Sequence, residues 1–192
     1  MSKNEGKIFE EQFKISCNRV DGLFYYRIKD VNAMSLKPGH RVSKNLYDSF
    51  LYKKPNLIPV ELKSVDGNRT KSIGFQLSKD DGNKHIKHHQ IEALKDASKT
   101  KGTIPGLILN FRFDDEEETY FIHINEFFHY MMVGQKKLEN TYSSKVNEKS
   151  INIDMCREIG IPIRSVKAKT KYYYHIKDFM GRLLEKYKED IE

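Results

Sequence analysis

Three charged residues in the sequence, Asp48, Glu61 and Lys63, have the types and spacing of a catalytic site. The segment KKPNLIPVELKSVDG (53–67) has turn-forming flanks and an apolar centre, which is typical of a buried β-strand. Side chains alternate along a strand, so Glu61 and Lys63 face the same side with Cα atoms about 6.6 Å apart. Burying an unpaired charge is costly. The pair is therefore expected either to lie on a solvated face or to act together on a charged ligand.

The chemistry expected of these residues is metal-assisted chemistry on a phosphate. Asp48 lies 13 residues before Glu61, and a hairpin would bring the two carboxylates together. Two carboxylates repel each other unless a cation lies between them. Oxygen ligands without a convergent His or Cys favour Mg²⁺ or Mn²⁺, and the Lys63 ammonium could bind a phosphate oxygen or hold an attacking water. A solvated strand face with an incidental salt bridge is the alternative, because short D…E-x-K patterns also occur by chance.

The surrounding sequence predicts the helices and strands that would position these residues. Apolar residues at helical spacing predict helices, and alternating or β-branched runs predict strands. Residues 65–84, rich in Gly, Asp and Lys, are expected to be weakly ordered, and Asn125 is expected to cap the helix that follows it. The chain is interpreted as one domain, residues 1–192, with a mixed β-sheet in an α/β sandwich. The predicted helices are 4–17, 85–98, 126–133, 152–160 and 176–187, and the predicted strands are 23–28, 45–52, 57–64, 106–113 and 119–124.

The composition limits the classes of protein to which the chain can belong. Of its 192 residues, 38% are hydrophobic and 32% are charged, and no apolar run approaches the roughly 20 residues of a membrane span. The N-terminal segment is too polar for a signal peptide, and the two cysteines make neither a disulfide framework nor a metal site. A reducing cytoplasm, bacterial or phage-infected, is therefore expected. The net charge of +7 and the pI near 9.2 favour a polyanionic partner such as nucleic acid.

Basic residues supply the candidate DNA contacts. Residues 31–47 contain no Asp or Glu, and Pro38-Gly39 in this segment predicts a projecting loop or hairpin. Lysines at every second position from 167 to 171 would share one face of an extended segment and follow a DNA backbone, although Lys also protects ordinary edge strands. Tyr25 and Tyr26 are expected to pack within their strand rather than to stack on bases. The candidate DNA-binding residues are Lys37, Arg41, Lys44, Arg27, Lys71, Lys167, Lys169 and Lys171.

Five segments carry a resemblance to a known family. They are GKIFEEQF, YYRIKD, YDSFLYKKPNLIPVELKS, HHQIEAL and KSINIDMCREIGI. In these segments the chain resembles the RecU family of Holliday-junction resolvases, especially its compact, phage-borne members, within the PD-(D/E)xK nuclease superfamily. The segments extend over nearly the whole chain in the expected order. The Asp-to-Glu spacing, the E-x-K motif and the His-Gln pair that opens the next helix all match, and this combination is far more specific than E-x-K alone.

The resemblance implies roles for individual residues. Asp48 and Glu61 would bind Mg²⁺, for which Mn²⁺ would substitute, and Lys63 would contact the phosphate or the water. Gln90 would orient the attacking water. Glu10 in the first helix would help to hold a metal, and its G-x-x-x-E spacing favours it over the neighbouring Glu11. The implied fold is a restriction-endonuclease-like mixed β-sheet flanked by helices, in which residues 31–47 form a projecting stalk that is short compared with cellular members.

The expected function is that of a metal-dependent, structure-selective DNA endonuclease. As a homodimer it would resolve four-way junctions by paired nicks that leave 5′-phosphate and 3′-hydroxyl ends, and a recombinase is a further expected partner. Two alternatives stay open. A restriction- or repair-type endonuclease of the same fold would cut linear duplex as readily as junctions. A non-catalytic junction-binding accessory protein would usually have lost an acid or the lysine, whereas Asp48, Glu61 and Lys63 are all present.

Overall fold

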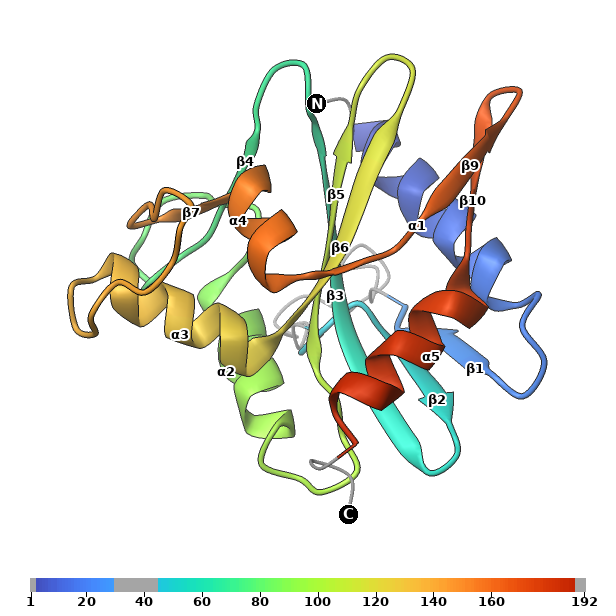
Figure 1. The fold of residues 1–192 in the computed structure, drawn as a ribbon, viewed down its shortest axis with the longest axis horizontal. Coiled ribbons are helices and arrows are strands. Elements are labelled where there is room, and N and C mark those ends of the chain that lie inside the picture. Colours follow the sequence, from blue (N-terminus) through green and yellow to red (C-terminus); the bar gives the residue numbers. More distant parts are fainter. Residues whose placement is uncertain (1–2, 30–44, 189–192) are drawn as a thin grey trace, which may run out of the picture.

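The computed structural model describes residues 3–29 and 45–188. The strands of its central sheet are β1 (Phe24–Arg27), β2 (Ser49–Lys53), β3 (Asn56–Asp66), β5 (Gly106–Arg112), β6 (Glu117–His123) and β8 (Ile161–Pro162). They lie in the order β1-β2-β3-β5-β6-β8, with β3 and β5 parallel and the other neighbours antiparallel (Figure 1). The predicted mixed sheet is therefore confirmed, and it is mostly antiparallel.

Helices cover both faces of this sheet (Figure 1). The helices are α1 (Lys3–Cys17), α2 (His88–Ala97), α3 (Ile124–Gly134), α4 (Ile153–Ile159) and α5 (Ile176–Lys186). α1 and α5 pack on one face, and α2, α3 and α4 pack on the other. Two small two-stranded sheets are added, β4 (Ser72–Gly74) with β7 (Ser150–Asn152) and β9 (Ser165–Ala168) with β10 (Lys171–Tyr174). No helix in the described part of the chain has the length and apolar character needed to cross a membrane.

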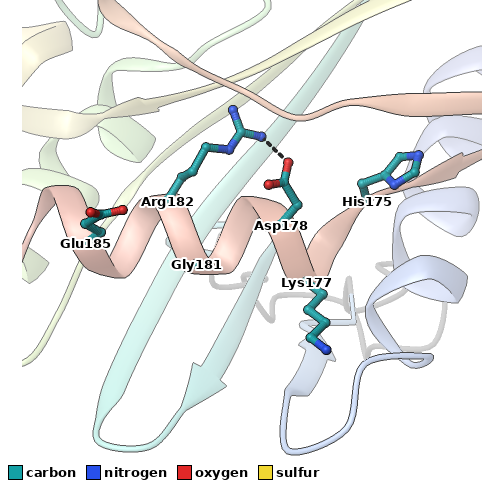
Figure 2. A pocket seen from close by; sticks show the side chains of 6 residues that line it. All are labelled: His175, Lys177, Asp178, Gly181, Arg182 and Glu185. Atoms are coloured by element: carbon teal, nitrogen blue, oxygen red, sulfur yellow. Dashed lines mark hydrogen bonds and ion pairs between the residues drawn. The ribbon is translucent and has the colours of Figure 1, made fainter.

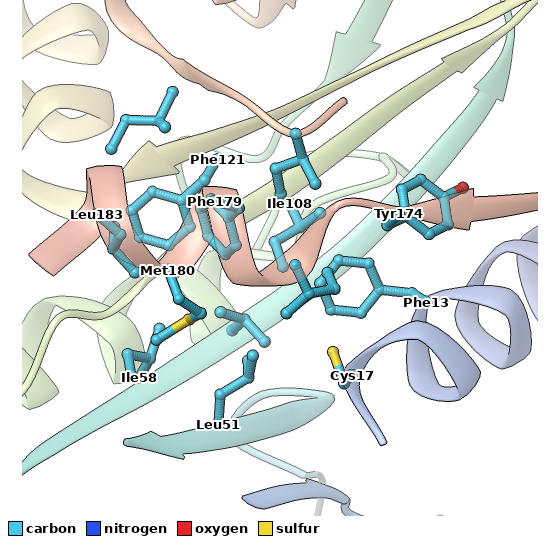
Figure 3. Close-up of a cluster of buried hydrophobic side chains, with 14 of the residues drawn as sticks. Phe13, Cys17, Leu51, Ile58, Ile108, Phe121, Tyr174, Phe179, Met180 and Leu183 are labelled. Atoms are coloured by element: carbon cyan, nitrogen blue, oxygen red, sulfur yellow. The ribbon is translucent and has the colours of Figure 1, made fainter. Parts of the chain in front are cut away.

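The core under α1 and α5 is built from alternate residues of the strands (Figure 3). Ile58, Val60 and Leu62 of β3 are buried on this side, so the side chains of Glu61 and Lys63 point to the other side. The apolar stripe predicted for the last helix is confirmed, because residues at i, i+3, i+4 and i+7 of α5 are buried against this core. These residues are Ile176, Phe179, Met180 and Leu183.

The second core lies between the sheet and α2, α3 and α4. Leu107 and Leu109 of β5 are fully buried here, against Ile91 and Leu94 of α2. Leu107 is the neighbour of Glu61 across the parallel β3–β5 ladder, and Leu109 is the neighbour of Lys63. Glu61 and Lys63 therefore lie on the sheet face that α2 covers, next to the second core, to which Val65 of the same strand belongs.

The segment 65–84 is ordered, and the prediction of weak order was wrong. Asp81 organises it, because its Oδ2 accepts hydrogen bonds from the backbone N–H groups of Leu77 and Ser78, at 2.6 and 3.3 Å. Gln76 donates to the backbone carbonyls of Asp81 and Gly82. The segment is further ordered by β4, which pairs with β7, and by Ile73 and Phe75, which are buried in the second core.

Two local predictions are also corrected. The third helix begins at Ile124 and not after Asn125: His123 is the N-cap, and its Nδ1 accepts a hydrogen bond from the Asn125 N–H. The lysines at 167, 169 and 171 do not share one extended face. Lys169 has a left-handed φ of 58° in a turn between β9 and β10, and the chain reverses there. Lys167 is opposite Tyr172 and Lys171 is opposite Ala168, which places the two lysines on different faces of the hairpin.

Candidate active site

Asp48 and Glu61 meet at the end of the β2–β3 hairpin. Ser49 is opposite Val60 in the antiparallel ladder, so Asp48 lies beside Glu61. Asp48 comes immediately before β2 and is not within a strand as predicted, but its carbonyl still accepts from the Ile28 N–H at 2.9 Å. Its carboxylate Oδ2 accepts from the Leu62 N–H at 3.0 Å. The backbone of β3 thus holds Asp48 between Glu61 and Lys63.

Lys63 bridges the two carboxylates. Its ammonium forms an ion pair with Glu61 Oε1, and its Nζ lies 3.9 Å from Asp48 Oδ2. Glu61 is fully buried, whereas the side chains of Asp48 and Lys63 keep partial exposure. The E-x-K motif and Asp48 therefore form a partly buried cluster of three ionisable groups, and the strand face that bears them is not fully solvated.

Gln90 of α2 reaches this cluster from another part of the chain. Its Nε2 donates to Glu61 Oε1, and its Oε1 accepts from the Lys87 backbone N–H at 2.8 Å. The second bond caps the start of α2, because the side chain at the third helical position accepts from the N-cap backbone N–H. The role expected for Gln90 was to orient a water molecule, and in the structure its amide contacts the carboxylate directly. Both the nitrogen and the oxygen of the Gln90 side-chain amide are therefore held by hydrogen bonds.

Burial determines the electrostatics of the cluster. Desolvation raises the pKa of Glu61 to about 8; Lys63 opposes this shift and Asp48 adds to it. Burial acts to lower the pKa of Lys63, but the carboxylates of Glu61 and Asp48 together raise it above its ordinary value. A buried carboxylate of this kind is stabilised by a proton or by a nearby cation. The site is therefore suited to cationic ligands.

Glu10 lies at the margin of the site. It forms a 2.6 Å ion pair with Arg27 of β1, and its charge contributes to the raised pKa of Lys63. Glu11 instead pairs with Lys14 at 3.3 Å on the exposed side of α1. The arrangement favours Glu10 over Glu11 as the first-helix carboxylate near the cluster, while its role as a metal ligand stays a prediction.

The carboxylate oxygens of Asp48 and Glu61 are ligands of the type that a hard divalent cation prefers. Glu61 Oε1 accepts from both Lys63 and Gln90, whereas the buried Glu61 Oε2 has no hydrogen-bond partner. Among residues 3–29 and 45–188, no group of three or more His, Cys, Asp or Glu side chains is placed to hold a metal ion. Mg²⁺ is commonly bound by one or two carboxylates, waters and substrate phosphates. Asp48 and Glu61 would supply the two protein carboxylates.

The predicted DNA contacts that fall within the described residues are spread over several elements. Lys37, Arg41 and Lys44 are outside the described residues. Lys167 donates to the Asp114 carbonyl at 2.9 Å, beside the turn between β5 and β6. The remaining candidates are Lys169 and Lys171 on the β9–β10 hairpin, Lys71 immediately before β4, and Arg27, which is paired with Glu10.

The sequence interpretation missed a basic cavity at the start of α2. It has a volume of about 600 Å³, and three of its lining residues directly precede Gln90 in the chain. His85, two residues before the N-cap Lys87, has its pKa lowered by burial and then by the charge of Lys63. The density of Lys and His from 79 to 89 was the available signal. The cavity is lined by Gln76, Lys79, Asn83, Lys87, His88 and His89.

A further pocket lies along α5, on the other side of the sheet (Figure 2). Arg182 there pairs with Asp178 at 2.7 Å and also donates to the Pro162 carbonyl at 2.7 Å. The buried side of α5 contacts the core that contains Ile58 and Leu62. This pocket is therefore on the face opposite to Glu61 and has no part in the cluster.

Comparison with known proteins places the chain in a family. No protein-family model matches it. The SPbeta prophage-derived uncharacterized protein YotM of Bacillus subtilis (strain 168) is 44% identical to the chain over 185 residues, which cover 96% of this chain and 89% of that protein. The chain belongs to the family of this prophage protein.

Proposed function

We propose that the chain is a metal-dependent, structure-selective DNA endonuclease that resolves four-way junctions by paired nicks. The observation that carries this proposal is the convergence of Asp48, Glu61, Lys63 and Gln90, with the buried Glu61 Oε2 left without a hydrogen-bond partner. Removing charged groups from water is costly. Two carboxylates and an ammonium that are partly buried together are therefore not expected at a place without a function. The resemblance to the RecU family and the prophage origin of the relative support the same proposal.

The fold supports a restriction-endonuclease-like architecture. A helix, three antiparallel strands, a helix and a parallel strand follow one another from α1 to β5, apart from the short β4. This order places the first acid before β2, the E-x-K motif on β3 and the glutamine on α2. The PD-(D/E)xK arrangement that the resemblance implies has the same assignment of residues to elements.

The residues have distinct chemical roles in this proposal. Asp48 and Glu61 would hold a divalent cation, which when bound stabilises charge on the phosphate and lowers the pKa of water. Lys63 would neutralise a non-bridging phosphate oxygen, where its positive charge acts in a partly desolvated site. Gln90 keeps the Glu61 carboxylate in a fixed orientation. Products would carry 5′-phosphate and 3′-hydroxyl ends, as in the family that the chain resembles.

Cleavage of a synthetic four-way junction in Mg²⁺, compared with a linear duplex of the same sequence, tests the proposal. The wild type is expected to nick the junction symmetrically and to leave the duplex largely intact. Asp48→Asn and Glu61→Gln are each expected to reduce the rate at least about a hundredfold, as loss of one charge-stabilising group does in other enzymes, while junction binding persists.

Glu92→Gln, on the exposed side of α2, serves as the matched control and should cut normally. Equal cutting of duplex and junction would favour the restriction- or repair-type alternative. If Glu61→Gln cleaves DNA at nearly the wild-type rate, the assignment of Glu61 to the active site is wrong. Junction binding without any cleavage in Mg²⁺ or Mn²⁺ would favour the non-catalytic alternative.

A further inference from the structure

Four aromatic side chains share one exposed face of β1 and β2. Phe24 is opposite Tyr52 and Tyr26 is opposite Phe50 in the antiparallel ladder, so all four point to the same side. Phe24, Tyr26 and Tyr52 are 54%, 46% and 42% exposed, respectively. Tyr26 packs on Phe24 of its own strand, as expected, but its side chain stays exposed, whereas Tyr25 is buried. We refer to Phe24, Tyr26, Phe50 and Tyr52 as the aromatic face.

Three of these rings form one continuous surface. The Phe24 and Tyr26 rings are nearly parallel, with an angle of 12° and centroids 6.4 Å apart. Phe50 lies 6.2 Å from Phe24 and 5.4 Å from Tyr26. The alternate residues Tyr25 and Leu51 are buried in the core on the opposite side. The exposed rings are therefore not needed to fill the core, and exposed apolar patches of this kind commonly mark binding sites.

The aromatic face is continuous with the candidate active site. Phe50 follows Asp48 by two residues and is opposite Pro59, which precedes Glu61 by two. Side chains two residues apart share a face, so the rings and both carboxylates lie on the same side of the sheet. At about 3.3 Å per residue, the two pairs of rings lie about 7 Å and 13 Å along the strand from Asp48. A stacked DNA strand covers this range in about two to four nucleotides.

We propose that the aromatic face is a stacking platform for unpaired bases of the DNA strand that is held at Asp48 and Glu61. This inference rests on the proposed nuclease function and adds the substrate class: DNA that is unpaired within a few nucleotides of the cut phosphate. Aromatic side chains stack on any base because every base has a π-face. Such a platform therefore selects unpaired structure and not sequence, which fits a structure-selective enzyme.

The position of the rings favours bases over a second protein as the occupant. Phe50 is two residues from Asp48, so a protein packed on the rings would also cover the approach to the carboxylates. A nucleotide strand can lie over the rings and present its backbone to Lys63 at the same time. The net charge of +7 further favours a polyanionic occupant.

The test is DNA binding by the full chain in EDTA, where no cleavage can occur. A labelled oligothymidylate and a fully paired duplex of equal length are titrated by fluorescence anisotropy. The combined substitution Phe24→Ala and Tyr26→Ala is expected to weaken binding of the single strand about tenfold or more and to change duplex binding less than about twofold. Val166→Ala, at a position that is 53% exposed on β9, is the control and should leave both affinities unchanged.

A second readout uses the absence of tryptophan from the sequence. Tyr26→Trp introduces the single tryptophan of the chain into the aromatic face, retains a stacking ring and is expected to keep single-strand affinity. Its fluorescence should be quenched by oligothymidylate and much less by duplex. Unchanged single-strand binding in the double-alanine variant, or no quenching in Tyr26→Trp, would overturn the proposal.

The outcomes separate this inference from the proposed function. Ring-dependent binding without any cleavage in Mg²⁺ would support the platform and contradict the nuclease. Junction cleavage together with DNA binding that does not depend on the rings would support the nuclease and contradict the platform. If the double-alanine variant instead changes a dimer into a monomer by light scattering and keeps its single-strand affinity, the aromatic face joins two copies of the chain and the platform is wrong.

Discussion

The two oxygens of Glu61 have unequal surroundings. Oε1 accepts from Lys63 and Gln90, whereas Oε2 is buried and has no hydrogen-bond partner. A buried polar atom without a partner costs free energy, so native proteins contain few of them, and they often occur at sites of function. Glu61 Oε2 is for this reason the atom of the cluster that we expect to contact a cation most directly.

Gln90 is a positioning residue, and its substitution should change the metal requirement. Gln90→Ala removes the donor to Glu61 Oε1 and the acceptor for the Lys87 N–H. Loss of such an outer partner typically costs about 10- to 100-fold in metal affinity or activity. We expect a slower cleavage rate that is partly restored at high Mg²⁺, measured as rate against Mg²⁺ concentration on a four-way junction.

Two comparisons make this prediction specific. Glu92→Ala, on the exposed side of the same helix, should keep the wild-type Mg²⁺ dependence. Circular dichroism should show that Gln90→Ala is folded, since only one capping contact is lost. A Gln90→Ala variant with an unchanged Mg²⁺ dependence and normal rate would show that the Gln90–Glu61 contact does not matter for the chemistry.

At the scale of elements, an ion pair joins β6 to α4. Glu118 pairs with Arg157, whose Nη2 and Nε donate at 2.5 and 2.9 Å, and it also accepts from the Tyr120 hydroxyl. The hydrogen bond from Arg157, followed by that from Tyr120, outweighs burial and lowers the pKa of Glu118. The ionised form of Glu118 is therefore bound more favourably in the folded state than in the unfolded state.

The lowered pKa of Glu118 in the folded state determines how this ion pair makes stability depend on pH. The stabilisation is fully present above the unfolded-state pKa of about 4.3 and is lost as the pH falls through the lower folded-state pKa. Glu118→Gln should therefore reduce the free energy of unfolding at pH 7, by about 1 kcal/mol or less because Arg157 is 49% exposed. Urea denaturation at pH 7 and pH 3 measures this, and the difference from wild type should shrink at pH 3. An equal loss at both pH values, or the same loss in the exposed Glu185→Gln, would contradict it.

Two glycines should respond to alanine in opposite directions. A Cβ at Gly106 of β5 would lie 2.5 Å from the Ile122 carbonyl oxygen and from the Phe121 ring, whereas a Cβ at Gly181 of α5 would meet nothing within 4 Å. Overpacking a core costs about 1–3 kcal/mol, and Gly→Ala in an open helix position gains up to about 1 kcal/mol. Urea denaturation should show Gly106→Ala less stable and Gly181→Ala more stable than wild type. If Gly106→Ala is as stable as wild type, the packing around β5 relaxes freely; if Gly181→Ala is less stable than wild type, the expected gain at the open helix position is wrong.

At the scale of the whole molecule, the proposed reaction requires two active sites. Resolution of a junction needs two nicks related by an approximate two-fold axis, and the sequence contains one D…E-x-K set. A C2 homodimer with one site per subunit is the natural solution. Light scattering is expected to report a dimer at micromolar concentration. A heterodimer of wild type with Asp48→Asn should nick one strand and leave the opposite strand intact.

The oligomeric prediction has a clear opposing result. A strict monomer, both free and bound to junction DNA, would count against a resolvase and favour a nicking or repair endonuclease of the same fold. Cutting of both strands by the mixed dimer would show that one site can act twice. The wild-type homodimer, treated in parallel, gives the rate of paired nicking against which both outcomes are measured.

Local patterns were sufficient for most of the elements. The stripe from Ile176 to Leu183 predicted α5, and the apolar centre of 53–67 between turn-forming flanks predicted β3, because both signals lie in neighbouring residues. The hairpin placed Asp48 beside Glu61 for the same reason, since the register follows from a short connection. The segment 65–84 was misjudged because it is ordered by side-chain hydrogen bonds of Asp81 and Gln76 and by pairing of β4 with the distant strand β7.

The sequence by itself determined the strand that bears Glu61 and Lys63, their shared face and their proximity to Asp48. Tertiary packing decided three things: the burial that raises the pKa of Glu61, the contact with Gln90 from 29 residues away, and the exposure of the aromatic face. The physical reason is that periodicity is a property of neighbouring residues. Burial and contacts between distant segments depend instead on which helix covers which part of the sheet.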